Sequence, residues 1–215
     1  MKRPRMFEDY RLFLSELKEN FTTLGAIVPS SPHLAKAIVM PLSQRGLRPV
    51  RVLEVGPGTG AFTDRILKHL RRGDVFDIYE LSPKFCGYLR RSLPFSDLRK
   101  QGIQIRLIND DIRNLRQSFD YHYIISGLPL NNFDSQIVSD ILEVLISHLS
   151  PDGVLSYFEY IFTHEFKARF LKPSERQRMI QVAKTVGSFI ARHQYAYSQV
   201  WWNLPPAKAR YCKRA

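Results

Sequence analysis

The sequence predicts an α/β fold in which a mostly parallel sheet of seven strands ends in an antiparallel hairpin. Between residues 50 and 160, short runs rich in β-branched and aromatic residues alternate with segments of helical spacing. Such alternation is typical of a parallel sheet covered by helices on both faces. Two further strand-like runs, residues 187–195 and 196–204, follow each other so closely that an antiparallel pairing is expected.

Five apolar-rich runs are predicted as the parallel strands. They cover residues 50–55, 75–80, 103–108, 121–126 and 153–160. Helices are expected over residues 61–72, 82–93 and 133–149, where apolar side chains recur at helical spacing. Ser82 and Pro83 suit the start of the second of these helices, as its cap and first helical residue. A basic helical stretch follows residue 160 and extends to about residue 184.

An amphipathic helix is predicted near the N-terminus, because apolar side chains recur there at spacings of three and four residues. They are Phe7, Tyr10, Leu14, Leu17 and Phe21, with basic side chains around them at Lys2, Arg3, Arg5, Arg11 and Lys18. Such a helix suits the surface of an anionic membrane, and it equally suits a lid packed on the domain. We therefore expect two parts: residues 1–45 with this helix and a covering segment, and residues 46–215 as the main domain.

The composition excludes several classes of protein. The chain has 215 residues, 44% of them hydrophobic, which is enough for one substantial core. Its formal net charge of +12 favours a polyanionic partner, either nucleic acid or an anionic membrane. Cys86 and Cys212 are too few for a disulfide framework or a zinc site, and the histidines show no ligand spacing, so no metal is expected. No apolar run approaches the roughly 18–20 residues that span a bilayer.

A glycine-rich turn follows the first predicted strand. Gly56, Gly58 and Gly60 open the next helix, where backbone N–H groups and the helix N-terminus can approach a ligand closely. Glu54 precedes this turn, and Glu80 ends the second strand, where a carboxylate can accept hydrogen bonds from both hydroxyls of a ribose. A nicotinamide dehydrogenase could use similar residues.

The third predicted strand ends in NDDI, residues 109–112. A carboxylate at this point can accept a hydrogen bond from an adenine amino group, and a backbone N–H is available to a ring nitrogen of the adenine. This third contact favours an adenosine-containing cofactor of another kind over the nicotinamide cofactor of a dehydrogenase. The alternative is that Asp110 and Asp111 only cap the turn after the strand.

Together these motifs resemble the class I S-adenosylmethionine-dependent methyltransferases over about residues 50–205. The motifs are LEVGPGTG, the carboxylate that ends the second strand, NDDI, and SGLP after the fourth strand. GAIVPSSPHLAKAI, SGLPLNNF and VWWNLPPAKARY are similar to segments of bacterial phospholipid N-methyltransferases. The resemblance implies a Rossmann-like fold and a peripheral enzyme on the cytoplasmic face of the plasma membrane. Its expected partners are an anionic membrane surface and phosphatidylethanolamine, methylated in steps toward phosphatidylcholine.

The resemblance also implies the residues of the site. The expected cofactor is S-adenosylmethionine, held by Glu54, Gly56, Gly58, Gly60, Glu80, Leu81, Asp111, Ile112, Ser126, Ser30 and Ser31. The amine substrate is expected at Gly127, Leu128, Pro129 and Tyr10. A primary alkyl amine has a pKa near 10, so it must lose a proton before it attacks the methyl group. The candidates to accept or relay that proton are Ser126, Glu159 and Tyr160. For Glu159, the alternative is an ion pair at the end of a strand.

The main rival is an RNA adenine N-methyltransferase, similar to the ribosomal RNA adenine dimethyltransferases. Those enzymes carry an Asn or Asp at the position of Ser126 and an aromatic residue, which stacks on the flipped base, at the position of Leu130. Phe133 could substitute as the stacking residue. A third hypothesis is a non-catalytic binding module on the same fold, which the intact glycine and acidic motif disfavours.

Two further groups of residues are relevant to the partner. A second basic region, which would suit phosphate headgroups and RNA equally well, consists of Lys167, Arg169, Lys172, Arg176, Arg178, Lys184 and Arg192. Trp201 and Trp202 are expected on opposite sides of the last strand, so that one lies in the core and the other near the surface.

Overall fold

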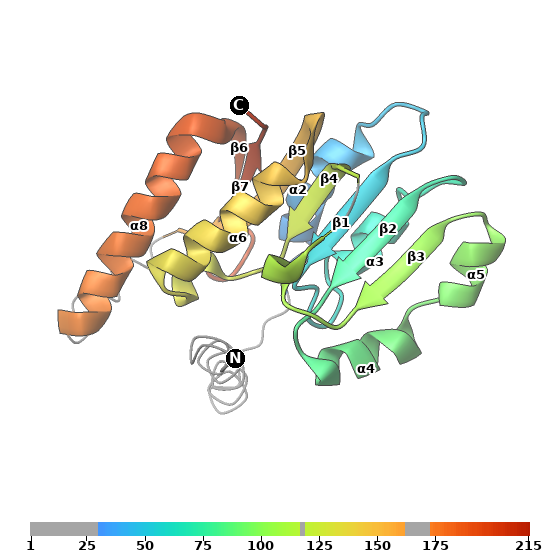
Figure 1. Cartoon of the computed structure of the whole chain (residues 1–215), viewed down its shortest axis with the longest axis horizontal. Helices are drawn as coiled ribbons and strands as arrows, with labels where there is room; N and C mark the ends of the chain where they lie inside the picture. The colour runs from blue at the N-terminus through green and yellow to red at the C-terminus, as the bar shows by residue number, and fades with distance from the viewer. Residues whose placement is uncertain (1–29, 117–118, 162–172) are drawn as a thin grey trace.

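The computed structural model describes residues 30–116, 119–161 and 173–215 (Figure 1). The predicted N-terminal amphipathic helix, with Tyr10, therefore lies outside the described residues, as do Lys167, Arg169 and Lys172 of the second basic region. The division of the chain at residue 45 remains a prediction.

One mixed sheet of seven strands organises the described part of the chain, in the order β3-β2-β1-β4-β5-β7-β6. The strands are β1 (Arg51–Val55), β2 (Val75–Tyr79), β3 (Gln104–Ile108), β4 (Tyr121–Ser126), β5 (Leu149–Tyr160), β6 (Gln194–Val200) and β7 (Ala207–Cys212). Strands β1 to β5 are parallel, and β7 pairs antiparallel with both β5 and β6. The predicted sheet with its antiparallel hairpin is confirmed.

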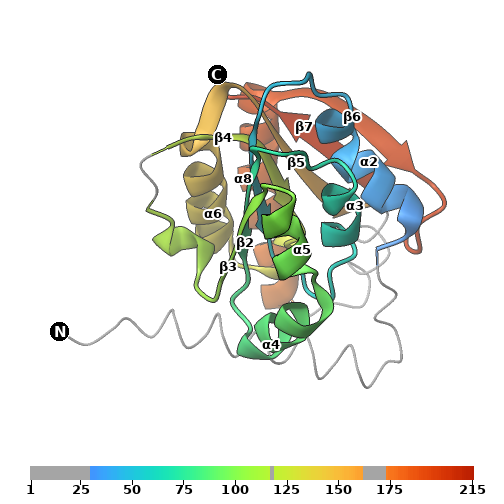
Figure 2. The ribbon, with the colours of Figure 1, turned by 90° about the vertical axis from the view of Figure 1, so that its right-hand side faces the viewer.

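Helices cover both faces of this sheet. The helices are α2 (Pro32–Ser43), α3 (Thr63–Leu67), α4 (Pro83–Ser92), α5 (Phe95–Lys100), α6 (Ser135–Ser147) and α8 (Pro173–His193), with short 3-10 turns at Ile112–Asn114 and Leu130–Asn132. Figures 1 and 2 show α6 and α8 on one face and α2 with α3 on the other. The two apolar cores agree with this arrangement, because Ile141 of α6 and Val186 of α8 belong to one core and Ile38 of α2 and Ile66 of α3 to the other.

The strand order contains one reversal of direction, between β1 and β4. From β1 the chain adds β2 and β3 on one side, and then crosses to add β4 on the other side of β1. In open α/β sheets, ligands bind at such a point, outside the carboxyl ends of the strands. This edge of the sheet, called the carboxyl edge below, carries the residues that follow Val55 and Ser126.

Two elements differ from the sequence-based expectations. The helix expected over residues 61–72 is only α3, Thr63–Leu67, because the glycine-rich turn occupies the residues before it. Residues 187–193 are not a strand but the last turns of α8; Val182, Val186 and Phe189 recur at helical spacing and are all buried. The hairpin therefore forms from β6 and β7.

The tryptophan expectation was also wrong. Trp201 and Trp202 lie in the connection between β6 and β7, beyond the end of the strand, so strand alternation does not apply to them. Both are exposed.

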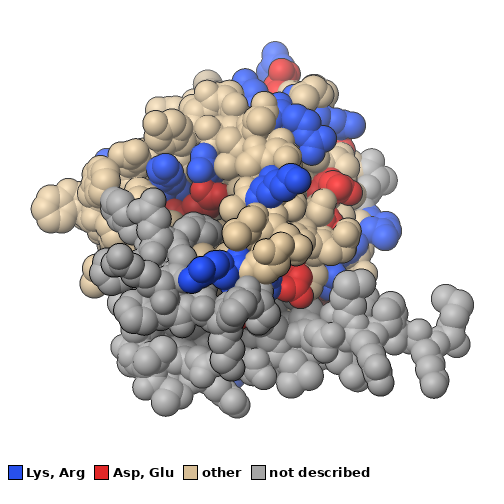
Figure 3. Space-filling model, turned by 90° about the vertical axis from the view of Figure 1, so that its left-hand side faces the viewer, with Lys and Arg blue, Asp and Glu red and all other residues tan. Residues whose placement is uncertain are grey.

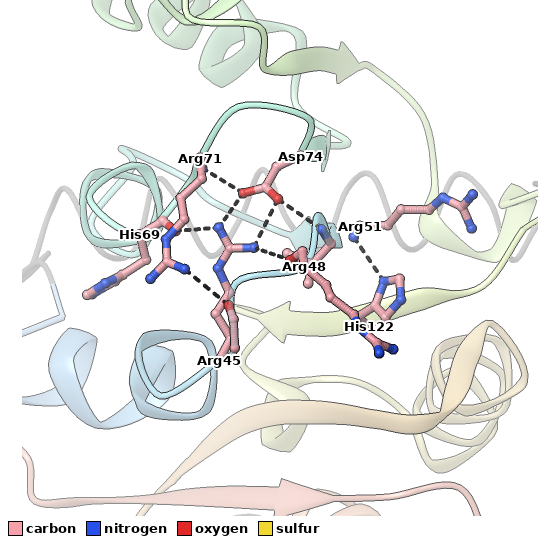
Figure 4. Close-up of polar contacts among 9 residues, drawn as sticks. Arg45, Arg48, Arg51, His69, Arg71, Asp74 and His122 are labelled. Carbon is pink, nitrogen blue, oxygen red and sulfur yellow. Dashed lines mark hydrogen bonds and ion pairs between the residues drawn. The ribbon is translucent and has the colours of Figure 1, made fainter.

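A buried ion pair closes the opposite edge of the sheet (Figure 4). The guanidinium of Arg45, just after α2, donates to both carboxylate oxygens of Asp74, at 2.9 and 2.6 Å, and both side chains are at most 1% exposed. The Asp74 carboxylate also accepts from the backbone N–H groups of Val50 and Arg71, and Arg45 donates to the His69 carbonyl. These contacts join the end of α2 to the starts of β1 and β2.

Candidate active site

The glycine-rich turn after β1 adopts a backbone that requires glycine. Gly56, Gly58 and Gly60 have φ values of +66°, +59° and +92°, in the left-handed region that side chains disfavour. Among the described residues, the nearest atom to a Cβ on Gly58 would be a ring carbon of Phe85 at 4.0 Å, so no described side chain fills the space beside this glycine. The turn can therefore accept a ligand at close range.

Glu54, the last residue but one of β1, is fully buried. Its Oε2 accepts a hydrogen bond of 2.8 Å from the Thr63 hydroxyl, whereas its Oε1 has no hydrogen-bond partner within the described part of the chain. Burial raises the pKa of Glu54 from 4.5 to about 8. A buried carboxylate with an unused oxygen suits a cationic ligand, because a positive charge would stabilise the ionised form.

Glu80, at the end of β2, connects the glycine-rich turn to the start of α4. Its Oε2 accepts from the Gly58 backbone N–H at 3.2 Å, and its Oε1 accepts from the Ser82 backbone N–H at 2.7 Å. Ser82 in turn caps α4, where its hydroxyl accepts from the Phe85 N–H. The carboxylate is only 6% exposed and is held in a defined orientation next to Gly58.

The residues after β3 are engaged in local contacts. Asn109 donates to the carbonyls of Glu80 and Leu81 at 2.8 and 3.0 Å, which joins the ends of β2 and β3. Asp111 is buried, accepts from the Arg113 backbone N–H as a cap, and forms an ion pair of 2.6 Å with the Arg113 guanidinium. The structure thus contains the capping arrangement that was the alternative for Asp111; a role of Asp111 and Ile112 toward adenine stays a prediction.

The turn after β4 packs directly on the glycine-rich turn. The Gly127 N–H donates to the Val55 carbonyl at 2.8 Å, and a Cβ on Gly127 would lie 2.5 Å from the Gly56 carbonyl oxygen. A Cβ on Gly56 would in turn lie 2.5 Å from a methyl carbon of Leu128. The predicted cofactor and substrate residues are therefore in contact at the point where the strand order reverses.

Ser126 ends β4 at this contact. The side chain is 1% exposed, and its hydroxyl accepts a long hydrogen bond of 3.4 Å from the Leu128 backbone N–H. The hydroxyl thus has hydrogen-bonding capacity left, and its contact with a ligand amine stays a prediction.

Phe133 is too deeply buried to serve as the residue on which an RNA base would stack. Phe133 is 1% exposed and Leu130 is 2% exposed, and both belong to the core beneath α6. A base that stacks on a side chain needs an exposed ring face, so the expectation that Phe133 could serve is wrong.

The two other candidate proton acceptors lie further along β5. Glu159 forms an ion pair with Arg210 of β7, with 2.6 Å between Oε2 and Nε, and Arg210 also donates to Gln194. This is the strand-end ion pair that was the alternative for Glu159. Burial raises the pKa of Tyr160, which keeps its phenol protonated and makes it a poor base.

Two residues at this edge were not anticipated from the sequence. Tyr157 pairs with Ser126 in the register of β4 and β5, and its buried hydroxyl has no hydrogen-bond partner among the described residues. Asn203 is 6% exposed, and its Oδ1 accepts from the Ser31 backbone N–H at 2.9 Å. The only sequence signal for Asn203 is an amide before a Leu-Pro-Pro turn, which does not identify a partner 172 residues away.

Ser30 and Ser31 lead into α2, next to the β6–β7 connection. The Ser31 hydroxyl accepts from the Leu34 N–H at 3.2 Å and caps the helix, and Ser30 is half-buried. Their contact with the methionine end of a cofactor remains a prediction.

The described surface has no concentrated basic patch on the face that carries α8. Arg176, Arg178, Lys184 and Arg192 belong to this helix. Figure 3 shows Lys and Arg side chains interspersed with Asp and Glu over this face. Within the described residues, no helix is long and apolar enough to cross a membrane.

Comparisons with known proteins agree with this fold. No protein-family model matches the sequence. An ornithine lipid N-methyltransferase of Singulisphaera acidiphila is 24% identical over 212 residues, with 96% of each chain covered. The N-methyltransferase NodS of Bradyrhizobium japonicum, in complex with S-adenosyl-L-homocysteine, has a TM-score of 0.58 at 14% identity and covers 82% of this chain and 83% of its own.

A third similar protein is the magnesium protoporphyrin IX methyltransferase ChlM of Synechocystis PCC 6803 with bound S-adenosylmethionine. Its TM-score is 0.60 at 14% identity, and the match covers 86% of this chain and 79% of that chain. The fold of this protein is that of the class I S-adenosylmethionine-dependent methyltransferases.

Proposed function

We propose that this protein is an S-adenosylmethionine-dependent N-methyltransferase that acts on the primary amine of a membrane lipid. The observation that carries the proposal is the contact between the glycine-rich turn and the Ser126–Pro129 turn at the carboxyl ends of β1 and β4. One turn suits the cofactor and the other suits a small aliphatic amine. The lipid N-methyltransferase that is similar over 96% of the chain supports the substrate class.

The cofactor is S-adenosylmethionine, and two observations support the fit. The space beside Gly58 is open, and Glu54 offers a buried oxygen without a partner to a cationic ligand. Glu80 would accept hydrogen bonds from the ribose, and the segment of Asp111 and Ile112 would receive the adenine. When bound, the cofactor supplies a methyl group on a positively charged sulfur, and no covalent enzyme intermediate is needed.

The protein contributes mainly the position and the protonation state of the amine. Placing a neutral amine in line with the transferred methyl group lowers the barrier by removing translational and rotational freedom. An alkyl ammonium must first lose its proton, and partial burial beside Ser126 favours the neutral form. Among the three candidates, Ser126 is best suited to orient the amine, since Glu159 is paired with Arg210 and Tyr160 stays protonated. The proton of the ammonium passes to water.

Phosphatidylethanolamine and ornithine lipid are the two substrates that we propose within this class. The first is suggested by the similar segments of phospholipid N-methyltransferases, and the second by the name of the relative. Both present a primary alkyl amine at the head of a lipid. An RNA adenine is the second candidate because the net charge is +12, but the burial of Leu130 and Phe133 leaves no stacking surface in this turn.

The test offers labelled S-adenosylmethionine to the full chain with each acceptor separately: phosphatidylethanolamine in detergent micelles, ornithine lipid in detergent micelles, and undermethylated ribosomal RNA. Label is expected in the organic phase with at least one of the lipids and absent from RNA. Label in RNA, or in no acceptor, would overturn the proposal. Gly58→Val is the matched negative control, because its side chain would occupy the open space beside the turn.

A further inference from the structure

The connection between β6 and β7 presents large apolar side chains to the surface. Trp201, Trp202 and Leu204 are 56, 82 and 76% exposed, and they lie within four consecutive residues. No charged residue occurs between Trp201 and Pro206. We call these three side chains the hairpin tip. Contiguous exposed apolar groups of this kind mark interaction sites, because exposure to water is unfavourable for them.

The hairpin tip rests on an anchored backbone. Asn203, between the exposed residues, is 6% exposed; its side chain accepts from the Ser31 N–H and donates to the Pro205 carbonyl at 2.7 Å. The Pro206 carbonyl accepts from the Ile161 N–H at 2.7 Å. The Asn203 side chain is thus held by two hydrogen bonds, while the three apolar side chains around it are exposed.

The hairpin tip lies at the same edge of the sheet as the candidate active site. Ala207 pairs with Tyr160 of β5 on one side and with Val200 of β6 on the other. Because β7 is antiparallel to both neighbours, β6 runs parallel to β5, and its end at Val200 lies at the carboxyl edge. This edge also carries Gly56 and Ser126. The hairpin tip and the candidate site therefore lie along the same edge of the sheet, with β5 between β4 and the hairpin.

We propose that the hairpin tip inserts into the interface of a lipid bilayer and holds the candidate active site against it. This inference rests on the proposed function, because an enzyme that methylates a lipid headgroup must reach the membrane surface. Trp favours the membrane–water interface, where its ring is apolar and its N–H finds a partner. The net charge of +12 complements an anionic lipid surface and adds attraction to the apolar insertion.

A second copy of the chain is a poorer occupant on grounds of area. Two partly exposed Trp side chains and one Leu can bury roughly 300–500 Å², whereas a specific protein interface needs about 800 Å² on each partner. A bilayer has no such requirement, since insertion of a few side chains and electrostatic attraction act together.

The sequence makes a direct test possible, because its 2 tryptophans are both in the hairpin tip. Vesicles of phosphatidylcholine and phosphatidylglycerol contain no amine substrate, so they separate docking from methyl transfer. On addition of such vesicles to the full chain, the tryptophan emission should shift to shorter wavelength, and brominated lipids should quench it. Vesicle binding without the emission shift or the quenching would overturn the inference, and so would a lack of binding. A blue shift that depends on protein concentration in the absence of lipid would also overturn it, because it would show that the hairpin tip contacts a second copy of the chain.

A pair of variants provides the control. Trp202→Ser combined with Leu204→Ser should lower the vesicle partition coefficient by about tenfold or more, because two large apolar side chains no longer enter the interface. Leu47→Ser removes a leucine that is more exposed than Leu204, at 89%, and that lies before β1 at the opposite edge. This change should leave the coefficient unchanged. Equal effects of the two changes would refute a specific role for the hairpin tip.

The two proposals can fail separately. Methyl transfer to lipid in detergent micelles does not require a bilayer, so activity there without tryptophan insertion would retain the proposed function and reject the docking surface. Tryptophan insertion without methyl transfer to any lipid would retain the docking surface and reject the proposed function.

Discussion

Gly127 lies against the backbone of Gly56, so that a Cβ on Gly127 would stand 2.5 Å from the Gly56 carbonyl oxygen. This contact joins the turn after β4 to the turn after β1, and neither backbone can retreat without breaking the hydrogen bond from the Gly127 N–H to Val55. The relative position of the two turns, and hence of a cofactor and an amine, therefore depends on the absence of one methyl group.

Replacing Gly127 by Ala should displace one turn from the other. We expect the free energy of unfolding to fall by about 1–3 kcal/mol, as for an overpacked core, and the affinity for S-adenosylhomocysteine to fall measurably. Denaturant unfolding and calorimetric titration would check this. Gly187→Ala in α8 is the control: no atom lies within 4 Å of its Cβ, so we expect a gain of about 0.5–1 kcal/mol. A Gly127→Ala protein that behaves like this control would contradict the close contact.

Ser126→Ala should separate turnover from folding. Its hydroxyl makes only a long hydrogen bond within the protein, so the free energy of unfolding should change by less than about 1 kcal/mol. If the hydroxyl orients the amine, kcat should fall by about tenfold to a hundredfold, with little change in the affinity for S-adenosylhomocysteine. Steady-state kinetics with the lipid substrate would measure this, and an unchanged kcat would remove Ser126 from the catalytic residues.

Glu159→Gln tests the remaining carboxylate candidate. Because Glu159 is paired with Arg210 across β5 and β7, we expect a loss of stability and no shift in the pH profile of kcat. Thermal unfolding and a pH series of initial rates would check both. Loss of the acidic limb of that profile, with stability retained, would show that Glu159 accepts the proton after all.

Glu54 should make the stability of the unliganded protein fall with rising pH. Burial raises its pKa from 4.5 to about 8, so the folded protein keeps a proton that the unfolded chain releases. This contribution is fully present below pH 4.5 and is lost as the pH rises through about 8. Glu54→Gln cannot ionise, so its Tm should exceed that of the parent increasingly between these pH values; a constant difference would show that Glu54 titrates normally.

The ion pair of Arg45 and Asp74 should act on stability alone. Asp74→Asn leaves a buried guanidinium without its charge partner, which costs about 3–5 kcal/mol of unfolding free energy. The specific activity of the folded fraction should be unchanged, since this pair lies at the edge opposite to the site. Asp97→Asn is the control: its pair with Lys100 is exposed and should contribute less than about 1 kcal/mol. Chemical denaturation of the three proteins would decide this, and equal losses would contradict the role of burial.

The sequence by itself determined the parts of this protein that depend on local chemistry. The alternation of strands and helices, the Ser82 cap of α4 and the glycine-rich turn after β1 all follow from residues within a short distance of one another in the sequence. The position of the site follows too, because parallel strands place their carboxyl ends at one edge.

Only the tertiary structure decided features that depend on distant partners. Residues 187–193 became helix because Val186 and Phe189 find a core against α6 and the sheet, although the local pattern also suited a strand. The same packing buried Phe133, and a partner 51 residues away engaged Glu159. Asn203, next to the exposed Trp202, likewise accepts a hydrogen bond from Ser31, 172 residues distant. Such contacts are set by three-dimensional packing, which short sequence patterns do not contain.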